Sequence, residues 1–197
     1  MLRKLSFGII LAALGFGVSN RVEAQAFEKG GTYLNLGLTG SDLFHINPNS
    51  DFYGGFYSSV VGGVTVQMEW GIHKYVGLGF TAGVQGGRRG FYGWYGPYAG
   101  SGYGELAIPV GVIANFHFYQ LIQDKTSKNI HGDKLDVYAG LNLGSGVSFY
   151  PTPSRVFPLF FVGPQVGAKY YVTPNIGLGL EVGYGKSFVN GGVTFKL

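Results

Sequence analysis

A strict alternation of residue types over residues 59–84 restricts the possible folds of this chain more than any other feature of the sequence. Every second residue from Val60 to Trp70 is apolar or glycine, and the alternation resumes from Val76 to Val84 after a short turn at residues 72–74. A period of two is the period of a β-strand, because successive side chains point to opposite faces. Two such segments joined by a tight turn predict a hairpin. Each segment has about ten or more residues, which is long for a soluble protein and suits a tilted strand that crosses a bilayer.

The same alternation recurs along the rest of the chain. It predicts eight strands, at residues 32–39, 60–70, 76–85, 104–118, 135–147, 159–172, 176–185 and 189–197. The connections at 71–75, 119–134 and 173–175 are mostly short, and those at 40–57, 86–103, 148–158 and 186–188 are mostly longer. Outer-membrane barrels have an even strand number, short periplasmic turns and longer outside loops. We therefore predict an all-β fold, an eight-stranded antiparallel up-and-down transmembrane barrel, in which the 119–134 turn is unusually long.

A soluble barrel or sandwich has the same strand period and is the alternative. Its outer face would need charged residues, but the polar faces here hold mostly Gly, Thr, Asn and Gln, and only 12% of all residues are charged. Large aromatic residues gather near the strand ends assigned to the periplasm, which is typical of a girdle at the bilayer interface. This predicted periplasmic girdle consists of Trp70, Tyr75, Phe116, Phe118, Tyr119, Tyr170 and Phe195. Because lipid cannot satisfy backbone polar groups, the sheet must close.

Residues 1–26 have the features of a secretory signal peptide. Arg3 and Lys4 precede an apolar run at residues 7–18, and residues 24–26 form an Ala-x-Ala cleavage signal. Twelve apolar residues are too few to span a bilayer easily, since about 20 are needed. We therefore expect residues 1–26 to be removed and residues 27–197 to form one barrel domain in the outer membrane of a Gram-negative bacterium.

The composition excludes several function classes. The chain has no Cys, which removes disulfides, thiolate metal sites and a Cys nucleophile. Its formal charge is +4, but the signal segment holds three basic residues and one acidic residue, which leaves 11 basic and nine acidic residues in the remainder. No Lys/Arg stripe is present, so nucleic acid is not expected as a partner.

The inner face of the predicted barrel combines glycine with a few ionisable residues. An eight-stranded barrel is just wide enough for its side chains to fill, and inward Gly at 77, 79, 83, 140, 144, 177, 179 and 183 leaves room for larger groups. The predicted polar lumen network comprises Gln67, Glu69, Glu105, Asp136, Lys169, Glu181 and Lys196. Buried charges need partners, so we predict that Lys169 and Lys196 pair with one or more of Glu69, Glu105 and Glu181. The network forms either a packed plug that stabilises the barrel or the lining of a narrow pore. Pro109 lacks an N–H and predicts a bulge or a weakened ladder point.

At this point the chain resembles the small OmpA/OmpX-type outer-membrane barrels. The segments EWGIHKYVGLG and YYVTPNIGLGLEVGYG and the ending GGVTFKL are similar to those of porin-family outer-membrane β-barrel proteins of Bacteroidota. The resemblance covers residues 27–197 and implies a fold and a location but no shared activity. It also implies recognition by the barrel-assembly machinery through a terminal aromatic residue. Here the last residue is Leu197 and Phe195 stands two positions earlier, which is a weakened form of that signal.

Enzymatic activity is not expected. Some small barrels resemble lipid-modifying enzymes, which need a His, a Ser and usually an acid at the outer rim. The four histidines, His45, His73, His117 and His131, do not combine with a Ser and a carboxylate in a plausible site, and each is expected to be solvated or interfacial. The segment GYGKS at 183–187 lacks the glycine that a phosphate-binding loop needs at position 181, which is Glu181. No cofactor or metal site is predicted.

The connection at residues 86–103 is the best candidate for a functional surface. Its Arg and aromatic residues suit an adaptable binding surface, lipopolysaccharide phosphates or headgroup packing. These residues are Arg88, Arg89, Phe91, Tyr92, Trp94, Tyr95 and Tyr98. The expected partners are outer-membrane lipid and lipopolysaccharide, the barrel-assembly machinery and an extracellular ligand. A structural or surface-interaction role through the outer loops is the first hypothesis, a narrow passive transport pore is the alternative, and a lipid-modifying rim enzyme is disfavoured.

Overall fold

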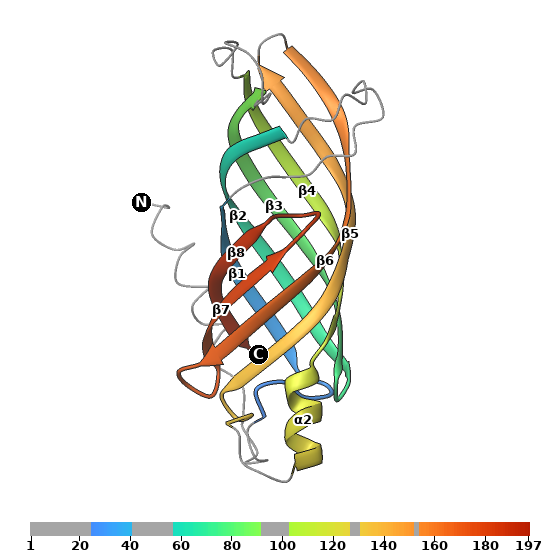
Figure 1. Ribbon diagram of the computed structural model, residues 1–197, viewed down its shortest axis with the longest axis vertical. Coiled ribbons are helices and arrows are strands. Elements are labelled where there is room, and N and C mark those ends of the chain that lie inside the picture. Colours follow the sequence, from blue (N-terminus) through green and yellow to red (C-terminus); the bar gives the residue numbers. More distant parts are fainter. Residues whose placement is uncertain (1–24, 41–56, 92–102, 127–130, 152–153) are drawn as a thin grey trace, which may run out of the picture.

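Eight antiparallel strands close into one barrel in which each strand pairs with its neighbours in sequence and β8 returns to β1 (Figure 1). The structure is a computed structural model that describes residues 25–40, 57–91, 103–126, 131–151 and 154–197. The strands are β1 (Thr32–Gly40), β2 (Tyr57–His73), β3 (Val76–Phe91), β4 (Tyr103–Phe116), β5 (Leu135–Pro151), β6 (Ser154–Tyr171), β7 (Ile176–Gly183) and β8 (Val189–Lys196). The predicted fold class is therefore confirmed.

The strands separate an apolar outer face from a polar and glycine-rich inner face. On β1, Leu38 is 69% exposed, whereas its neighbour Thr39 is buried. Seven of the strands present at least one large exposed apolar side chain, as shown by Leu38, Val64, Leu78, Val112, Leu141, Val166 and Leu178. This arrangement is the reverse of a soluble barrel, in which the apolar face points inward.

One end of the barrel holds the short turns and is called the turn end here. It includes the β2–β3 turn at residues 74–75, the β6–β7 turn at residues 172–175 and the helix α2 (Phe118–Thr126), which lies below the strands in Figure 1. The opposite end is called the loop end. No helix among the described residues has the length and apolarity needed to span a membrane.

The predicted strand at 104–118 ends two residues too late, and the long turn predicted after it is wrong because it contains a helix. β4 stops at Phe116, and α2 occupies the first part of the predicted 119–134 turn, so Phe118 is a helical residue. The α2 sequence, FYQLIQDKT, has no Gly or Pro and contains the good helix formers Leu, Gln and Lys. Alternation over the preceding residues hid this signal because Phe116 and Phe118 continue the period-two pattern.

The predicted loops at 86–103 and 148–158 are also too long. β3 extends to Phe91, so Arg88 and Arg89 are strand residues that pair with both β2 and β4. β5 and β6 pair as far as Pro151 with Ser154, through the segment that its prolines had indicated as a loop. Strand propensity depends on cross-strand contacts, and here the pairing continues through residues that are poor strand formers.

The prolines of β6 are tolerated because of where their nitrogen atoms point. Pro164 accepts a hydrogen bond from Tyr184 N through its carbonyl, so its backbone polar groups face β7. Pro158 is six residues earlier and has the same orientation, because alternate strand residues face the same side. Pairing of β6 with β7 ends at Gln165 and Gly183. Pro158 therefore directs its missing N–H away from β5 and does not interrupt the β5–β6 ladder.

Pro109 weakens its ladder without a bulge, which confirms one of the two predicted outcomes. The β3–β4 ladder pairs Ala82 with Val110 and Gln85 with Ala107, and no pair is formed between these two. The register is the same on both sides of the interruption, whereas a bulge would have shifted it. On its other side Pro109 pairs with Gly146 of β5.

Candidate functional site

An ion pair between β6 and β2 lies within the lumen. Lys169 Nζ is 2.8 Å from Glu69 Oε2, although the two strands are not neighbours in the sheet. Both residues are buried, and taking a charge out of water is costly unless a partner compensates it. The ammonium group also lies over the rings of Tyr138 and Tyr33, at 4.8 and 5.5 Å from their centroids. These aromatic faces add an attractive cation–π interaction.

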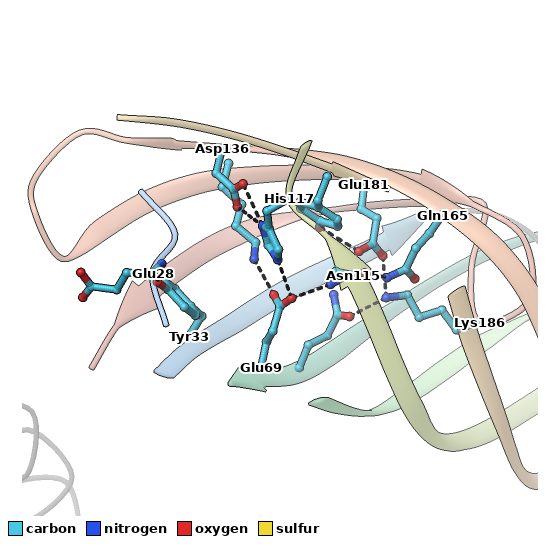
Figure 2. Close-up of polar contacts among 12 residues, drawn as sticks. Glu28, Tyr33, Glu69, Asn115, His117, Asp136, Gln165, Glu181 and Lys186 are labelled. Atoms are coloured by element: carbon cyan, nitrogen blue, oxygen red, sulfur yellow. Dashed lines mark hydrogen bonds and ion pairs between the residues drawn. The ribbon is translucent and has the colours of Figure 1, made fainter. Parts of the chain in front are cut away.

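His117 bridges two buried carboxylates just beyond the end of β4. Its Nδ1 lies 2.8 Å from Asp136 Oδ1 and its Nε2 lies 3.0 Å from Glu69 Oε1 (Figure 2). Burial by itself lowers the pKa of the imidazole, but the hydrogen bonds to both carboxylates outweigh it and raise the pKa. Only the imidazolium form can donate from both nitrogens at once. The geometry therefore favours a positively charged His117.

The residues before β1 close the lumen at the turn end. The ring of Phe27 is fully buried and stacks on His117, with 3.4 Å between centroids and 7° between planes. Ala26 N donates to Gly132 O at 2.9 Å, and Glu28 N donates to the Tyr33 hydroxyl at 2.7 Å. These contacts fix residues 26–28 across the opening of the barrel.

A second ion pair lies nearer the loop end. Lys186, from the connection between β7 and β8, binds Glu181 and also donates to Gln67 Oε1 (Figure 2). The other oxygen of the Glu181 carboxylate, Oε2, accepts a hydrogen bond from the Tyr138 hydroxyl at 2.9 Å. Tyr138 therefore touches both ion pairs, one through its hydroxyl and the other through its ring.

A chain of amide side chains connects the two ion pairs. Asn115 Nδ2 donates to Glu69 Oε1, and Gln165 Nε2 donates to Asn115 Oδ1, both at 2.8 Å. Asn142 Nδ2 then donates to Gln165 Oε1, and Lys186 N donates to Asn142 Oδ1, both at 3.2 Å. A fully connected buried network is stable, whereas a partly satisfied one is costly. This chain therefore links the charges of the lumen into one unit.

The charges of this network balance. Its carboxylates are Glu69, Asp136 and Glu181, and its cationic groups are Lys169, Lys186 and protonated His117. Loss of the His117 proton would leave one uncompensated negative charge in a low-dielectric interior. The net charge of the network is therefore zero only while His117 is protonated.

Little free space remains among these side chains. The cavity between the two ion pairs has a volume of about 10 Å³, which is room for about one water molecule. It is lined by Tyr33, Asn35, Gln67, Glu69, Ile113, Asn115, Tyr138, Lys169 and Glu181. Toward the loop end, Ala107, Leu159 and Phe161 form a buried apolar cluster. Within the part of the barrel that the structure describes, side chains fill the lumen between the two ion pairs.

The structure brings together five of the seven residues predicted for the lumen. Gln67, Glu69, Asp136, Lys169 and Glu181 are buried and belong to the network. The pairing expected for Lys169 with Glu69 is formed. The side chain of Glu105 lies outside the described part of the structure.

The prediction for Lys196 is wrong. Its Nζ lies 3.0 Å from Glu28 Oε1 and 3.0 Å from Gln25 O, at the turn end. β8 ends at this residue, so the long side chain reaches the segment before β1 instead of the lumen. Lys186 takes the place that the prediction gave to Lys196, as the second lysine bound to a lumen carboxylate.

The predicted girdle residues divide into three groups. Trp70, Phe116 and Tyr170 are 40–50% exposed on the outer face near the turn end, and Phe195 is partly exposed there. Tyr75 lies in the β2–β3 turn and donates its hydroxyl hydrogen to Asp124 Oδ2 at 2.8 Å. Phe118 and Tyr119 belong to α2 and not to the barrel wall.

The predicted binding loop is described only at its start. Arg88, Arg89 and Phe91 are in β3, whereas Tyr92, Trp94, Tyr95 and Tyr98 lie outside the described residues, as does His45. The prediction that His117 is solvated or interfacial is wrong, because the residue is fully buried. His73 and His131 are exposed.

The predicted set omitted Tyr138 and the amide residues Asn115, Asn142 and Gln165. It also omitted His117, Lys186 and Phe27. His117 stood on the inward face of its strand pattern, next to Asn115, and this parity was the signal that could have identified it. Lys186 was assigned to a short loop, and only the fold of that connection turns it inward. Phe27 precedes the first strand, and no periodic pattern includes it.

Comparisons with known proteins support the fold. No protein-family model matches the chain, and no curated protein sequence matches it. Among solved structures, the outer membrane protein OprG from Pseudomonas aeruginosa is similar, with a TM-score of 0.59 and 9% identity over 87% of this chain and 97% of that chain. The attachment invasion locus protein Ail of Yersinia pestis gives a TM-score of 0.42 with 15% identity, over 85% of this chain and 95% of that chain. A de novo designed transmembrane β-barrel gives 0.40 with 17% identity, over 87% and 99%. At these identities the likeness to OprG shows the fold alone.

Proposed function

We propose that this chain is an integral outer-membrane β-barrel protein with a closed lumen, and that it acts at the cell surface through the connections at its loop end. The observation that carries this proposal is the filled lumen. In the described part of the barrel, two ion pairs, the His117 bridge and the amide chain occupy it, and the cavity between the two pairs has about 10 Å³. A barrel whose lumen is filled by side chains is better suited to a role as a membrane scaffold than to passive transport of solutes.

The membrane location is supported by the outer face. Large apolar side chains such as Leu38, Leu141 and Leu178 are 58–69% exposed around the barrel. Soluble monomers rarely expose a continuous apolar surface of this extent, whereas an outward apolar band is expected of a barrel in lipid. Insertion by the barrel-assembly machinery, contact with lipopolysaccharide and removal of residues 1–26 belong to the same proposal. The finer resemblance, to porin-family barrels of Bacteroidota, stays a prediction that rests on the turn sequences.

Two measurements test the barrel and its closed lumen. Purified protein in detergent should migrate faster on a gel before boiling than after it, because a closed barrel resists unfolding by detergent. A chain that never shifts would contradict the barrel in detergent. In planar lipid bilayers the same preparation should give no reproducible conductance steps. Regular steps would support the narrow pore instead, and a Lys169→Met variant with altered steps would assign them to this lumen.

The surface role is tested at the loop end. Because β3 continues to Phe91 and β4 begins at Tyr103, a deletion should be confined to residues 92–102 so that both strands stay paired. Cells that carry the deleted protein should bind less to a panel of extracellular surfaces than cells with the intact protein. A Trp94→Ser/Tyr95→Ser/Tyr98→Ser variant separates loss of the aromatic side chains from loss of loop length. Equal binding by all three proteins, at equal surface abundance, would remove this loop from the proposal.

A further inference from the structure

The helix α2 has two faces of different character. Successive helical residues are about 100° apart, which places Gln120, Gln123 and Asp124 within about 100° of one another. Gln120 is 1% exposed and therefore lies on the face covered by the rest of the protein, and an added Cβ on the buried Gly132 would meet the Gln123 side chain. Phe118, Ile122 and Lys125 lie on the opposite face.

That opposite face is apolar where it leaves the barrel and is not covered by the described residues. Ile122 is 45% exposed, and Phe118, one turn earlier, is half-buried. Two residues before Phe118, Phe116 is 43% exposed on the outer face of β4. Exposed apolar side chains are thus present both on the outer face of β4 next to the helix and on α2 itself.

The charges around α2 favour an anionic partner over a cationic one. The only carboxylate on the helix, Asp124, is neutralised by Lys74, whose Nζ lies 3.0 Å from Asp124 Oδ2. Tyr75 donates to the same oxygen, and these two hydrogen bonds lower the pKa of Asp124. Lys125, in the last turn of the helix, is exposed. The free charge on the outer face of α2 is therefore positive.

The dimensions of α2 match those of a lipid headgroup layer. A helix rises about 1.5 Å per residue, so Ile122 lies about 6 Å and Lys125 about 10 Å beyond Phe118 along the axis. A bilayer has about 30 Å of hydrocarbon within a total of about 40–45 Å, which leaves about 5–8 Å of headgroup region on each side. If Phe118 marks the hydrocarbon boundary and the helix axis runs along the bilayer normal, Ile122 falls within the headgroup region and Lys125 just beyond its aqueous edge.

From these observations we propose that α2 is an interfacial helix, whose Phe118–Ile122 face contacts the phospholipids of the periplasmic leaflet while Lys125 binds their phosphates. This inference rests on the proposed membrane location. Helices that expose apolar side chains beside basic ones bind at the boundary of headgroups and acyl chains. The tether of Asp124 to Lys74 and Tyr75 holds α2 at the correct depth, and the helix extends the lipid contact of the barrel beyond its strands.

The absence of cysteine from the sequence permits a direct test by single-site spin labelling. Three variants, Ile122→Cys, Leu141→Cys and Lys29→Cys, are each labelled with a nitroxide and reconstituted into phosphatidylethanolamine–phosphatidylglycerol vesicles. Leu141 is 60% exposed at mid-barrel and reports immersion in lipid, whereas Lys29 is exposed at the turn end and reports water. Collision rates with oxygen, which partitions into lipid, and with a polar nickel chelate, which stays in water, give the depth of each label.

We expect the Ile122 label to collide several-fold less with the nickel chelate than the Lys29 label does, and less with oxygen than the Leu141 label does. A label at Ile122 as accessible to the chelate as that at Lys29, with Leu141 immersed, would overturn the inference for α2 and leave the barrel proposal intact. Exposure of the Leu141 label to the chelate would instead contradict the membrane location. Protection of the Ile122 label in native envelope fragments, but not in lipid vesicles, would assign the face to a periplasmic protein and overturn the lipid contact.

Discussion

The ring of Phe27 lies parallel to the imidazole of His117, with 3.4 Å between their centroids, although 90 positions separate the two residues in the chain. His117 is bound on its two nitrogens by Asp136 and Glu69. Phe27 therefore covers the ring face of protonated His117, whose two nitrogens are already hydrogen-bonded. This contact joins the segment before β1 to the charged core of the lumen and gives the turn end of the barrel its closure.

Replacement of Phe27 should destabilise the barrel strongly. Phe27→Ala removes a fully buried ring, and such substitutions cost about 3–5 kcal/mol of unfolding free energy. Urea titration in lipid vesicles, followed by gel mobility without boiling, would measure the loss. Val172→Ala is the control, because Val172 is 59% exposed in a turn and its truncation should have little effect. Equal unfolding midpoints for the two variants would show that Phe27 does not close the lumen.

The Lys169–Glu69 pair should behave as a coupled unit. Lys169→Met or Glu69→Gln alone leaves the buried network with one uncompensated charge, and such single changes cost about 3–5 kcal/mol. The double variant should cost less than the sum of the two, because neither charge is then left alone in the core. A double-mutant cycle on urea unfolding measures this coupling. Strict additivity would mean that the two groups do not interact.

Lys186 and Lys196 should differ in their effect on stability. Lys186 is buried and binds Glu181 and Gln67, whereas Lys196 pairs with the half-exposed Glu28. Lys186→Met should cost several kcal/mol because it leaves Glu181 without its cation, and Lys196→Met should cost less than about 1 kcal/mol. A Lys196→Met variant that unfolds as easily as Lys186→Met would contradict the observed pairing.

Glycine is required on the inner face and not on the outer one. A Cβ at Gly144 would lie 2.2 Å from Phe161 Cζ and 2.4 Å from Val110 O, whereas a Cβ at Gly62 would meet nothing within 4 Å. Gly144→Ala should therefore destabilise the barrel by about 1–3 kcal/mol through overpacking. Gly62→Ala should be neutral or slightly stabilising, since alanine restricts the unfolded chain. The reverse order of stabilities would mean that the faces of the strands are assigned incorrectly.

The tether of α2 should weaken in acid. The pKa of Asp124 in the folded protein lies below its ordinary value, because Tyr75 and Lys74 donate hydrogen bonds to the carboxylate. The stabilisation is thus present above the unfolded-state pKa of about 3.9 and is lost as the pH falls through the folded-state value. A spin label at Ile122 should gain mobility below about pH 4, and Asp124→Asn should give the mobile spectrum at every pH. An acid-independent spectrum in the unmodified chain would show that this tether does not hold the helix.

How far the sequence predicts the fold is clear from β2 and β3. Their alternation predicted two strands and the turn between them, and Gln67 and Glu69 were placed on the inner face before their partners were known. The ends of strands were less predictable. β3 runs on to Phe91 and β6 begins at Ser154 because cross-strand pairing continues through residues that are poor strand formers by themselves.

By itself the sequence determined the faces of the strands, because side-chain parity follows from the strand period alone. It thereby determined the closed eight-stranded barrel and which polar residues point inward. Only the tertiary structure decided which of these residues meet. The pairs Lys169–Glu69, Lys186–Glu181 and Phe27–His117 join segments that are not adjacent in the sheet or lie outside the strands. Their contacts depend on barrel closure and on the paths of short connections, for which one sequence carries no periodic signal.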